Sequence, residues 1–476
     1  MSSKILWFLL SVMLLFCSAC TNNRNMPSEE SPSPLPRQEK QQEFNTPEPT
    51  SKQQQEYDDN LSKSGKEAVE ENINGFDISE DESITRQAES LMMTQIHTAV
   101  DQEEIKQLAE SKSKSAKNDI LLMYNKQLPP EIIYDVKYEK YNLTYDYFLV
   151  TSEETVNIYR NPDSDDEVVC TAGIYEKLAL HQQVSGKTFG DSNIWYKVSC
   201  KHDGEIVTGY IHSSAGTTRT FQFDKMLNAI KNLQQQLAQG KLNHISNYKN
   251  VNGDPPKKGE GATDEFGMRI YQSAPGYFQP DTSSDLRYCP DGMLVRILEE
   301  VGEFYRVEVS SYNQELYVPK KYIDTDNALS KLAHVVIVDR NQQNQAAFEI
   351  SDGNIRMISY TLATTGLKGE SSFETPLGYY RAIEKKDRFE YLKDGSDEIA
   401  GYAPYATRFC GGAYIHGIPV AYEQKDGQLV DPGITEYLHT IGTFPRSHMC
   451  VRNFSSHAEF IYNWLDTSVG AVIVIE

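Results

Sequence analysis

The sequence predicts a mainly β chain of several domains, with two small β-barrels and a C-terminal β-sandwich that contains one short helix. Three observations support this prediction. At 476 residues the chain is too long for one ordinary core. From about Tyr145 onward, short apolar runs alternate with turn residues, as in β-strands. Residues 21–80 are instead rich in Pro, Ser, Gln and Glu, which predicts a disordered acidic tether.

The first twenty residues predict a signal for export. Lys4 precedes an apolar run at residues 5–16, and the small residues Ser18 and Ala19 stand directly before Cys20. This layout resembles a bacterial lipobox, in which the cysteine becomes a lipid-modified N-terminus, although a second cysteine stands where leucine is usual. We therefore expect a lipoprotein signal peptide at residues 1–20. The mature protein would be a membrane-anchored lipoprotein that faces the periplasm or cell wall.

Residues 81–140 predict a helical spacer, because Leu91, Met92 and Ile96 recur at helical spacing. The net charge of the whole chain is −22, which argues against nucleic acid as a partner and against attraction to anionic lipid.

Residues 145–216 predict the first barrel, with five short strands. The segments "VNIYRNP", "WYKV" at 195–198 and "GYIHSS" at 209–214 resemble bacterial SH3-like domains. Such domains commonly bind cell-wall peptide or glycan, and a structural spacer fits the same pattern. Fold alone leaves the two roles open.

A helix and polar linker are predicted at 221–262, with the helix at Asp224–Gln239 ending at a glycine. A second SH3-like domain is then predicted at 263–326, where "EFYRVEV" aligns with "IWYKVSC" of the first.

Residues 331–476 predict the C-terminal β domain, through strand-like runs such as "HVVIVDR", "RMISYTLATTG" and the terminal "GAVIVIE". One helix interrupts them at "SHAEFIYNWL". Ser456 and Glu459 have capping-box spacing, so this helix should begin a few residues after Cys450. His457 should then lie in its first turn and face solvent.

Cys450 is the candidate nucleophile of this domain. A thiol attacks only when ionised, which requires a base or positive charge nearby. In an extended chain His448 and Arg452 project to the same side as Cys450 and would flank its sulfur. His416, 34 positions upstream at a strand end, is the candidate general base.

Other roles for this cysteine stay open at this point. It could be inert and buried, paired with Cys410 in a disulfide, or part of a zinc site with His416, His448 and Cys410. Five of the seven cysteines remain after Cys20, which leaves at least one thiol unpaired in an oxidising compartment. Cys170 and Cys200 either form a bridge or are both buried. The nucleophile is the interpretation we favour.

Four segments together resemble the L,D-transpeptidase (YkuD-type) catalytic domain. They are "TPLGYYRAI" (375–383), "AYIHGI" (413–418), "PRSHMCVRN" (445–453) and the closing "AEFIYNWLDTSVGAVIVI", in the order that the family has them. The resemblance implies a cysteine acyltransferase that acts on peptidoglycan stem peptides. It makes Cys450 the nucleophile and His416 its base, oriented by a backbone carbonyl near Gly417.

The resemblance also assigns the surrounding residues. Ser447 and His448 would shape the pocket, Arg452 would orient substrate, and backbone N–H groups around Met449 and Cys450 would form the oxyanion hole. A tetrapeptide stem would lose its terminal D-alanine to give a thioester, and a second stem would resolve it as a 3→3 cross-link. No cofactor or metal is expected. Water as acceptor would make an L,D-carboxypeptidase, a protein amine would attach a protein to the wall, and a disabled site would leave a non-catalytic wall-binding protein.

Two features depart from the family pattern. Met449 stands where the family mostly has Gly, which places a thioether at the pocket rim and requires an ordinary backbone conformation. The long interval between His416 and Cys450 holds "AYEQKDGQLVDPGITEYLHT", either a lid-like insertion or an inert surface loop. Arg408, which precedes the His416 strand, is expected to meet a stem-peptide carboxylate or an exposed acid.

Overall fold

The computed structural model describes residues 119–476, except 139, 142, 164–166, 203–204, 259–260, 370–371 and 393–397. The expected signal peptide, tether and most of the helical spacer lie outside the described residues. The described end of that spacer forms strands β1 (Ile120–Met123) and β2 (Ile132–Tyr134) instead of a helix. β2 pairs parallel with a strand of the C-terminal domain, so tertiary pairing outweighs local helical spacing there. Within the described part of the chain, no helix has the length and apolar character needed to cross a membrane.

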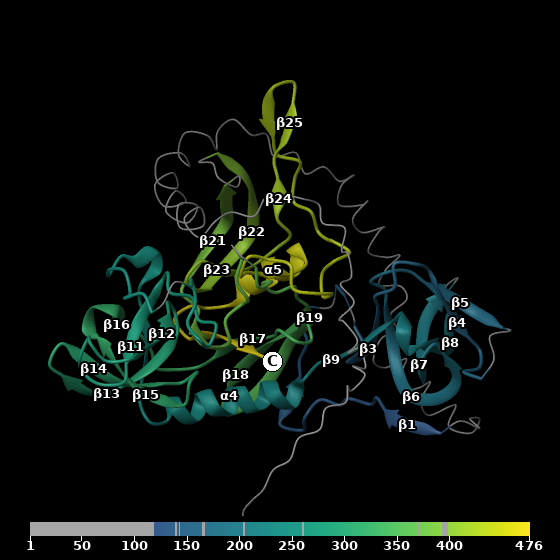
Figure 1. Ribbon diagram of the computed structural model, residues 1–476, viewed down its shortest axis with the longest axis horizontal. Helices are drawn as coiled ribbons and strands as arrows, with labels where there is room; N and C mark the ends of the chain where they lie inside the picture. The colour runs from purple at the N-terminus through teal and green to yellow at the C-terminus, as the bar shows by residue number, and fades with distance from the viewer. Residues whose placement is uncertain are drawn as a thin grey trace, which may run out of the picture. The chain divides into compact units, whose positions relative to one another are not determined.

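The first β unit is one antiparallel sheet (Figure 1). Its strands are β3 (Asp146–Val150), β4 (Val156–Tyr159), β5 (Val168–Ala172), β6 (Lys177–Phe189), β7 (Ser192–His202), β8 (Glu205–His212) and β9 (Gly216–Thr220), with a 3-10 turn at Ser213–Ala215. They lie in the order β5-β4-β8-β7-β6-β3-β9, and β1 pairs with β6. Phe148, Leu180, Val198 and Ile211 belong to a core of its own.

The second β unit follows helix α4 (Phe223–Leu237), which confirms the predicted helix. Its strands are β10 (Leu242–Ile245), β11 (Ser273–Tyr277), β12 (Leu286–Pro290), β13 (Leu294–Val301), β14 (Phe304–Val309), β15 (Gln314–Pro319) and β16 (Ile323–Leu329), with 3-10 turns at Tyr248–Asn250 and Lys320–Tyr322. They lie in the order β12-β11-β15-β14-β13-β10-β16. Helix α4 buries Phe223, Met226, Ile230 and Leu233, one face at helical spacing.

The two predicted β-barrels are open sheets in the described residues, and the SH3-like identity of the two units stays a prediction. In neither unit do the two edge strands of the sheet pair with each other. These are β5 and β9 in the first unit and β12 and β16 in the second. In the second unit, β10 lies between β13 and β16, although its residues precede the predicted domain at 263–326 in the sequence. An apolar face that packs on a neighbouring domain is already covered, so its sheet can stay open.

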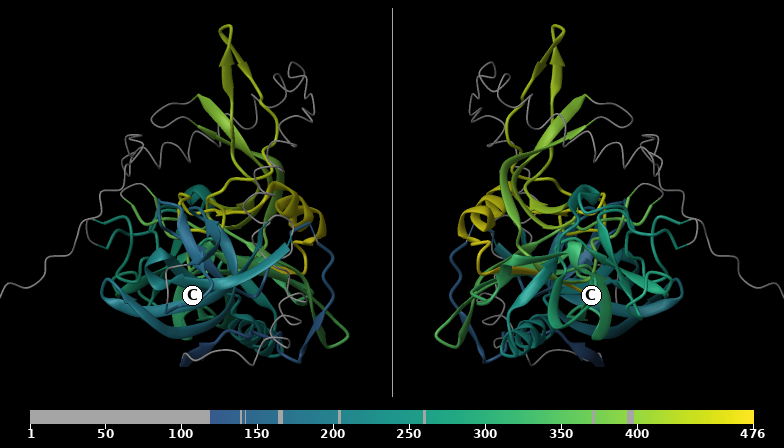
Figure 2. Two further views of the ribbon diagram at one scale, coloured as in Figure 1. Left: turned by 90° about the vertical axis from the view of Figure 1, so that its right-hand side faces the viewer. Right: turned by 90° about the vertical axis from the view of Figure 1, so that its left-hand side faces the viewer.

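The C-terminal domain confirms the predicted mainly β fold with one short helix. One sheet has the order β2-β19-β18-β17-β28-β20 and the other β21-β22-β23-β27, with β24 on β22. The strands are β17 (His334–Asp339), β18 (Asn344–Ser351), β19 (Asn354–Leu362), β20 (Gly378–Arg381), β21 (Glu384–Leu392), β22 (Ile399–Cys410), β23 (Ala413–His416), β24 (Val420–Ala421), β27 (Val451–Arg452) and β28 (Gly470–Ile475), and the helix is α5 (Ser455–Trp464). A separate hairpin, β25 (Glu423–Lys425) and β26 (Gln428–Val430), extends away from the other strands of this domain (Figure 2).

One core joins the second β unit to the C-terminal domain. Met293 and Val309 of the unit lie in the same buried cluster as Tyr380 and Phe409 of the domain. Gly292 has a φ of +83°, and a Cβ there would lie 2.0 Å from the Phe409 carbonyl oxygen. Only glycine permits both this conformation and this approach.

Candidate active site

Strand pairing brings Cys450 and His416 to one face of a sheet. Cys450 directly precedes β27, which pairs parallel with β23 through Ile415 with Val451 and His416 with Arg452. Ile415 and Val451 are buried in the shared core. Because side chains alternate along strands, His416 and Arg452 project to the opposite face. Cys450 lies between Met449 and Val451, which both pack in the shared core, so its side chain projects away from that core as well. Cys450 is half-buried and not in a disulfide.

His416 is held as a neutral base. Its Nδ1 lies 2.6 Å from the Gly417 carbonyl oxygen, which can only accept, so Nδ1 carries the hydrogen and Nε2 carries the lone pair. Burial lowers the pKa of His416 to about 4, and the charge of Arg452 lowers it further against the opposing Gly417 hydrogen bond. The imidazole is therefore uncharged at neutral pH and able to take a proton.

The chain around Gly417 is fixed by close packing. A Cβ at this glycine would lie 2.8 Å from the Ser455 hydroxyl oxygen and 3.0 Å from its Cα. The same hydroxyl accepts a hydrogen bond from Ile418 N at 3.0 Å. The start of α5 thus sets the carbonyl that orients His416.

Cys450, the candidate nucleophile, has two polar contacts. The Cys450 Sγ lies 3.7 Å from the Gly412 carbonyl oxygen, in the turn between β22 and β23. The Ser447 hydroxyl donates to the Cys450 carbonyl at 2.5 Å. Ser447 is buried, so this hydrogen bond stabilises the loop from its interior side. His448 is exposed and lies in a bend, so the extended geometry expected for this stretch begins only at Val451.

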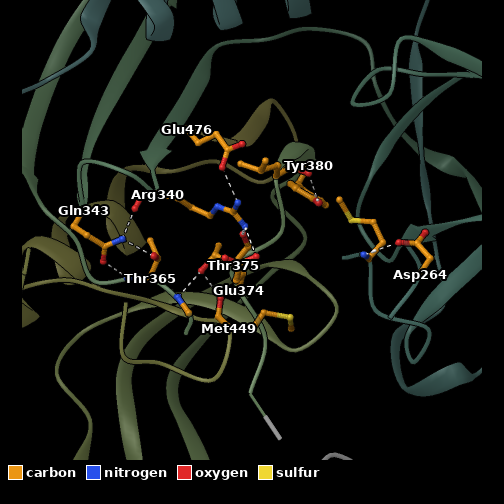
Figure 3. Close-up of polar contacts among 12 residues, drawn as sticks. Asp264, Arg340, Gln343, Thr365, Glu374, Thr375, Tyr380, Met449 and Glu476 are labelled. Carbon is orange, nitrogen blue, oxygen red and sulfur yellow. Dashed lines mark hydrogen bonds and ion pairs between the residues drawn. The ribbon is translucent and has the colours of Figure 1, made fainter. Parts of the chain in front are cut away.

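A polar network supports the loop and includes residues that sequence reasoning missed. The Thr375 hydroxyl donates to the Met449 carbonyl at 2.8 Å and accepts from Gly366 N at 2.9 Å. Arg340 donates to the Thr375 carbonyl at 3.0 Å and forms ion pairs with Glu374 and Glu476, as Figure 3 shows.

The network continues to Gln343, whose side chain exchanges hydrogen bonds with Thr365 at 2.7 and 3.0 Å (Figure 3). Thr365, Thr375 and Gln343 are all buried. In the sequence, Thr375 stands out only as the first residue of the segment "TPLGYYRAI" (375–383). The only signal in the sequence for these residues is a threonine near a predicted strand. It does not identify the hydrogen-bond partners, because the contacts join separate segments that no short motif links.

Met449 has an ordinary backbone conformation, because it is absent from the residues with positive φ in the described chain. Its side chain is 8% exposed and packs in the shared core. It also lines a pocket with Arg269 of the second β unit and Phe373. The thioether therefore faces the second unit.

The insertion after His416 is anchored by two acidic residues that follow its β25–β26 hairpin. Asp431 pairs with Arg388 and accepts from the Tyr402 hydroxyl, both at 3.1 Å. Glu436 is buried and accepts from Tyr141 at 2.7 Å and from Ser456 N at 2.8 Å.

Glu436 replaces the capping box that the sequence predicted. Helix α5 has Phe454 at its N-cap with no side-chain cap, and Ser456 lies inside the first turn. A carboxylate brought from the insertion satisfies the exposed N–H groups instead. His457 faces the interior, where Ser359 contacts it at 3.1 Å, which corrects the expected solvent-facing position.

Arg408 does not face a substrate site. It is buried and pairs with Asp291 of the second β unit at 2.6 Å and with Glu384 at 3.1 Å. Of the two acids, Glu384 is partly exposed, as expected for a partner of Arg408, whereas Asp291 is buried and was not foreseen.

The other cysteines among the described residues, Cys170, Cys200, Cys289 and Cys410, are not in disulfides. The sulfur atoms of Cys170 and Cys200 lie 2.8 Å apart without a disulfide. Cys410 is buried and is not bonded to Cys450. Among the residues that the structure describes, no three His, Cys, Asp or Glu side chains are grouped to hold a metal ion.

A half-buried cysteine and a neutral, oriented histidine on one face of neighbouring strands form an arrangement suited to covalent acyl transfer. Residues 333–475 match the sequence model of the L,D-transpeptidase catalytic domain family, YkuD. The match covers less than half of the chain. No curated protein matches the chain significantly.

Solved structures show distant likeness. An L,D-transpeptidase from Mycobacterium smegmatis is 12% identical over 63% of this chain and 99% of its own, with a TM-score of 0.24. L,D-transpeptidase 1 of Mycobacterium tuberculosis is 15% identical over 38% of this chain and 87% of its own, with a TM-score of 0.21.

A fused Zn-dependent amidase/peptidase/peptidoglycan-binding domain-containing protein from Clostridium acetobutylicum is 18% identical over 30% of this chain, with a TM-score of 0.20. This chain spans about half of that protein, 51%. Identities and TM-scores this low support no statement about function.

Proposed function

We propose that this chain is a peptidoglycan L,D-transpeptidase, exported and membrane-anchored through a lipid on Cys20, that forms 3→3 cross-links between stem peptides. The observation that carries the proposal is the shared face of Cys450 and His416, with the histidine tautomer set by Gly417 at 2.6 Å. The family match over residues 333–475 supports the reaction class.

The first half-reaction forms a thioester. His416 Nε2 takes the proton of the Cys450 thiol, and the sulfur attacks the carbonyl carbon of the third stem residue. Backbone N–H groups around Met449 would stabilise the oxyanion. When the C–N bond to the terminal D-alanine breaks, the protonated His416 returns its proton to the leaving amine. Because the pKa of His416 is low, at about 4, its protonated form readily gives this proton up.

The second half-reaction restores the thiol. The amine of a second stem attacks the thioester carbonyl carbon, His416 removes the proton of that amine, and the C–S bond breaks as Cys450 regains a proton. Arg452, whose backbone pairs with Thr364 at 2.9 Å, is held beside His416 and would orient the peptide.

Intact-protein mass spectrometry tests the proposal. The chain from residue 21 is mixed with a tetrapeptide muropeptide, with Cys450→Ala as the matched control. We expect a covalent adduct of the stem minus D-alanine on the unchanged protein alone, followed by a cross-linked dimer. A tripeptide product would instead identify water as the acceptor. No adduct and no D-alanine release from a folded protein would contradict the proposal.

A further inference from the structure

The insertion after His416 returns to the candidate base through Ser455, the first residue of α5. The side chain of Ser455 is buried, and the residue is only 1% exposed. Its hydroxyl accepts a hydrogen bond from Ile418 N at 3.0 Å and donates one to the Thr435 carbonyl at 2.5 Å. Ile418 lies two residues after His416, whereas Thr435 belongs to the insertion. A single hydroxyl therefore connects the backbone beside the base to the insertion.

We infer that the insertion positions the general base and that Ser455 is the positioning residue that connects the two. The inference rests on the proposed transpeptidase function, in which His416 takes the proton of the thiol. It gives the insertion a role different from that of a lid or of an inert surface loop. Because Ser455 is buried, it acts on His416 through the backbone at Gly417.

One peptide unit transmits the position of the hydroxyl to the histidine. The Gly417 carbonyl and the Ile418 N–H belong to the same peptide unit, which is planar, so the two groups point in opposite directions. The carbonyl accepts from His416 Nδ1 at 2.6 Å, and the N–H donates to the Ser455 hydroxyl at 3.0 Å. Holding the N–H therefore holds the carbonyl that sets the histidine tautomer.

The backbone before this peptide unit is fixed independently. Gly417 N donates to the Pro404 carbonyl at 2.9 Å, and the His416 carbonyl accepts from Asn453 N at 2.9 Å. Glycine can still turn about its Cα–C bond, because it has no side chain to restrict that rotation. The hydrogen bond from Ile418 N to Ser455 removes this freedom, so it decides where the Gly417 carbonyl points.

The insertion is a firm support for Ser455. Ser455 N donates to the Glu436 carbonyl at 3.2 Å, directly after the Thr435 carbonyl that accepts from its hydroxyl. The ring of Tyr437 is buried and stacks on Phe454 at 5.8 Å between the centroids. A hydroxyl that donates to a fixed carbonyl is also a stronger acceptor, because hydrogen bonds in a chain polarise one another.

Nitrogen NMR of the histidine rings at pH 7 tests the inference without substrate. The chain from residue 21 carries ¹⁵N-labelled histidine, and His416→Gln identifies the signals of His416. We expect the unchanged protein to carry the ring hydrogen on Nδ1, and Ser455→Ala to show a mixture of both tautomers. Ser455→Cys has a weaker acceptor and should give a smaller change, and Ser455→Thr keeps the hydroxyl and should restore the Nδ1–H form.

The rate of D-alanine release from a tetrapeptide stem gives the second readout. Ser455→Ala should lower kcat about tenfold or more and leave KM within about twofold, because a misplaced base slows the chemical step. Ser456→Ala is the matched control. Ser456 lies in the same turn and its hydroxyl also contacts the insertion, at Glu436, but its other partner is Tyr138. It should keep the tautomer and kcat of the parent.

A folded Ser455→Ala protein with the tautomer and kcat of the parent would overturn the inference and leave the transpeptidase proposal intact. An equal change in Ser456→Ala would also overturn it, because general damage at the start of α5 would then explain the effect. If the unchanged chain forms no adduct with the stem, the transpeptidase proposal falls, while the tautomers still report whether Ser455 positions His416.

Discussion

The two β units share a sequence pattern but differ in what they pack against. The first has a core cluster of its own that includes Phe148 and Val198, and only the opposite face of β3, with Tyr147, joins a cluster of the C-terminal domain. The second shares one continuous core with the C-terminal domain through Met293 and Tyr380. The second unit is therefore part of the scaffold of the candidate site, because its core includes Ile415 and Val451, whereas the first unit keeps most of its apolar residues in a separate core.

Polar contacts show the same contrast. The second unit is fixed by the buried ion pair of Asp291 and Arg408. The first meets the domain through the buried ring of Tyr147 in β3 and through partly exposed polar contacts, such as Tyr175 with Arg446. Loss of a buried pair costs far more than loss of an exposed one.

Breaking the buried pair should have the largest effect. Asp291→Ala leaves Arg408 buried with only Glu384 and should lower the free energy of unfolding by about 3 kcal/mol or more. Urea unfolding followed by tryptophan fluorescence measures this loss. The double variant Asp291→Leu, Arg408→Met should recover part of it, because it removes the uncompensated charge. An unchanged midpoint in Asp291→Ala would contradict the scaffold role.

Acid should destabilise the C-terminal domain through its buried histidines. Burial lowers the pKa of His457 to about 3, below its ordinary value near 6.5. Since the unfolded state then binds the proton more tightly, stability is full above about pH 6.5 and falls as the pH approaches 3. His457 alone should account for about 3 kcal/mol at pH 4.

Hydrogen exchange at acidic pH should distinguish the two β units. Between pH 6.5 and 4, β14 of the second unit should lose protection together with the C-terminal domain, while β7 of the first keeps it longer. His457→Asn should flatten the pH dependence of the free energy of unfolding, measured relative to its own value at pH 7. Equal loss in both units would contradict independent packing.

Oxidation should act on the first unit alone. Cys170 and Cys200 have sulfur atoms 2.8 Å apart, and both are free in the structure. In a mild oxidant we expect a disulfide between them that stabilises this unit by about 2–3 kcal/mol. Non-reducing peptide mapping and unfolding with and without reductant measure both effects, with Cys170→Ser as the control. A disulfide from either residue to Cys450 would contradict the position of this cysteine pair in the core of the first unit.

The smallest expected effect is at the contact of the first unit with the insertion. Tyr175 stacks with His439 at 5.9 Å and its hydroxyl accepts from Arg446 at 2.9 Å. Tyr175→Ala should cost less than about 1 kcal/mol of stability, because the contact is partly exposed. The rate of D-alanine release should stay within about twofold. A large loss of rate would mean that the first unit controls the active site.

The sequence predicted strands well because alternation and turn residues are local signals. It indicated the nucleophile and base because His416 and Cys450 lie in short motifs. It did not predict that the sheets stay open, since this depends on which faces the domain covers. It also did not predict the buried partner of Arg408, because Asp291 lies far away in the chain.

The helix α5 shows the same limit. Ser456 and Glu459 have the spacing of a capping box, but the carboxylate of Glu436 arrives from the insertion and takes that role. The local pattern predicts the helix, but tertiary structure determines which group caps it. The supporting threonines of the nucleophile loop were missed for this reason as well, because Thr375 meets Met449 only in the folded chain.

The central claim is that His416 activates Cys450, and alkylation kinetics test it most directly. The rate of iodoacetamide modification of Cys450 at pH 7 is measured by peptide mapping, with the urea-unfolded chain as reference and the buried Cys289 as internal control. We predict that folded Cys450 reacts much faster than in the unfolded chain and that His416→Ala removes this advantage. Equal rates in the folded protein, the unfolded chain and the His416→Ala variant would contradict the claim.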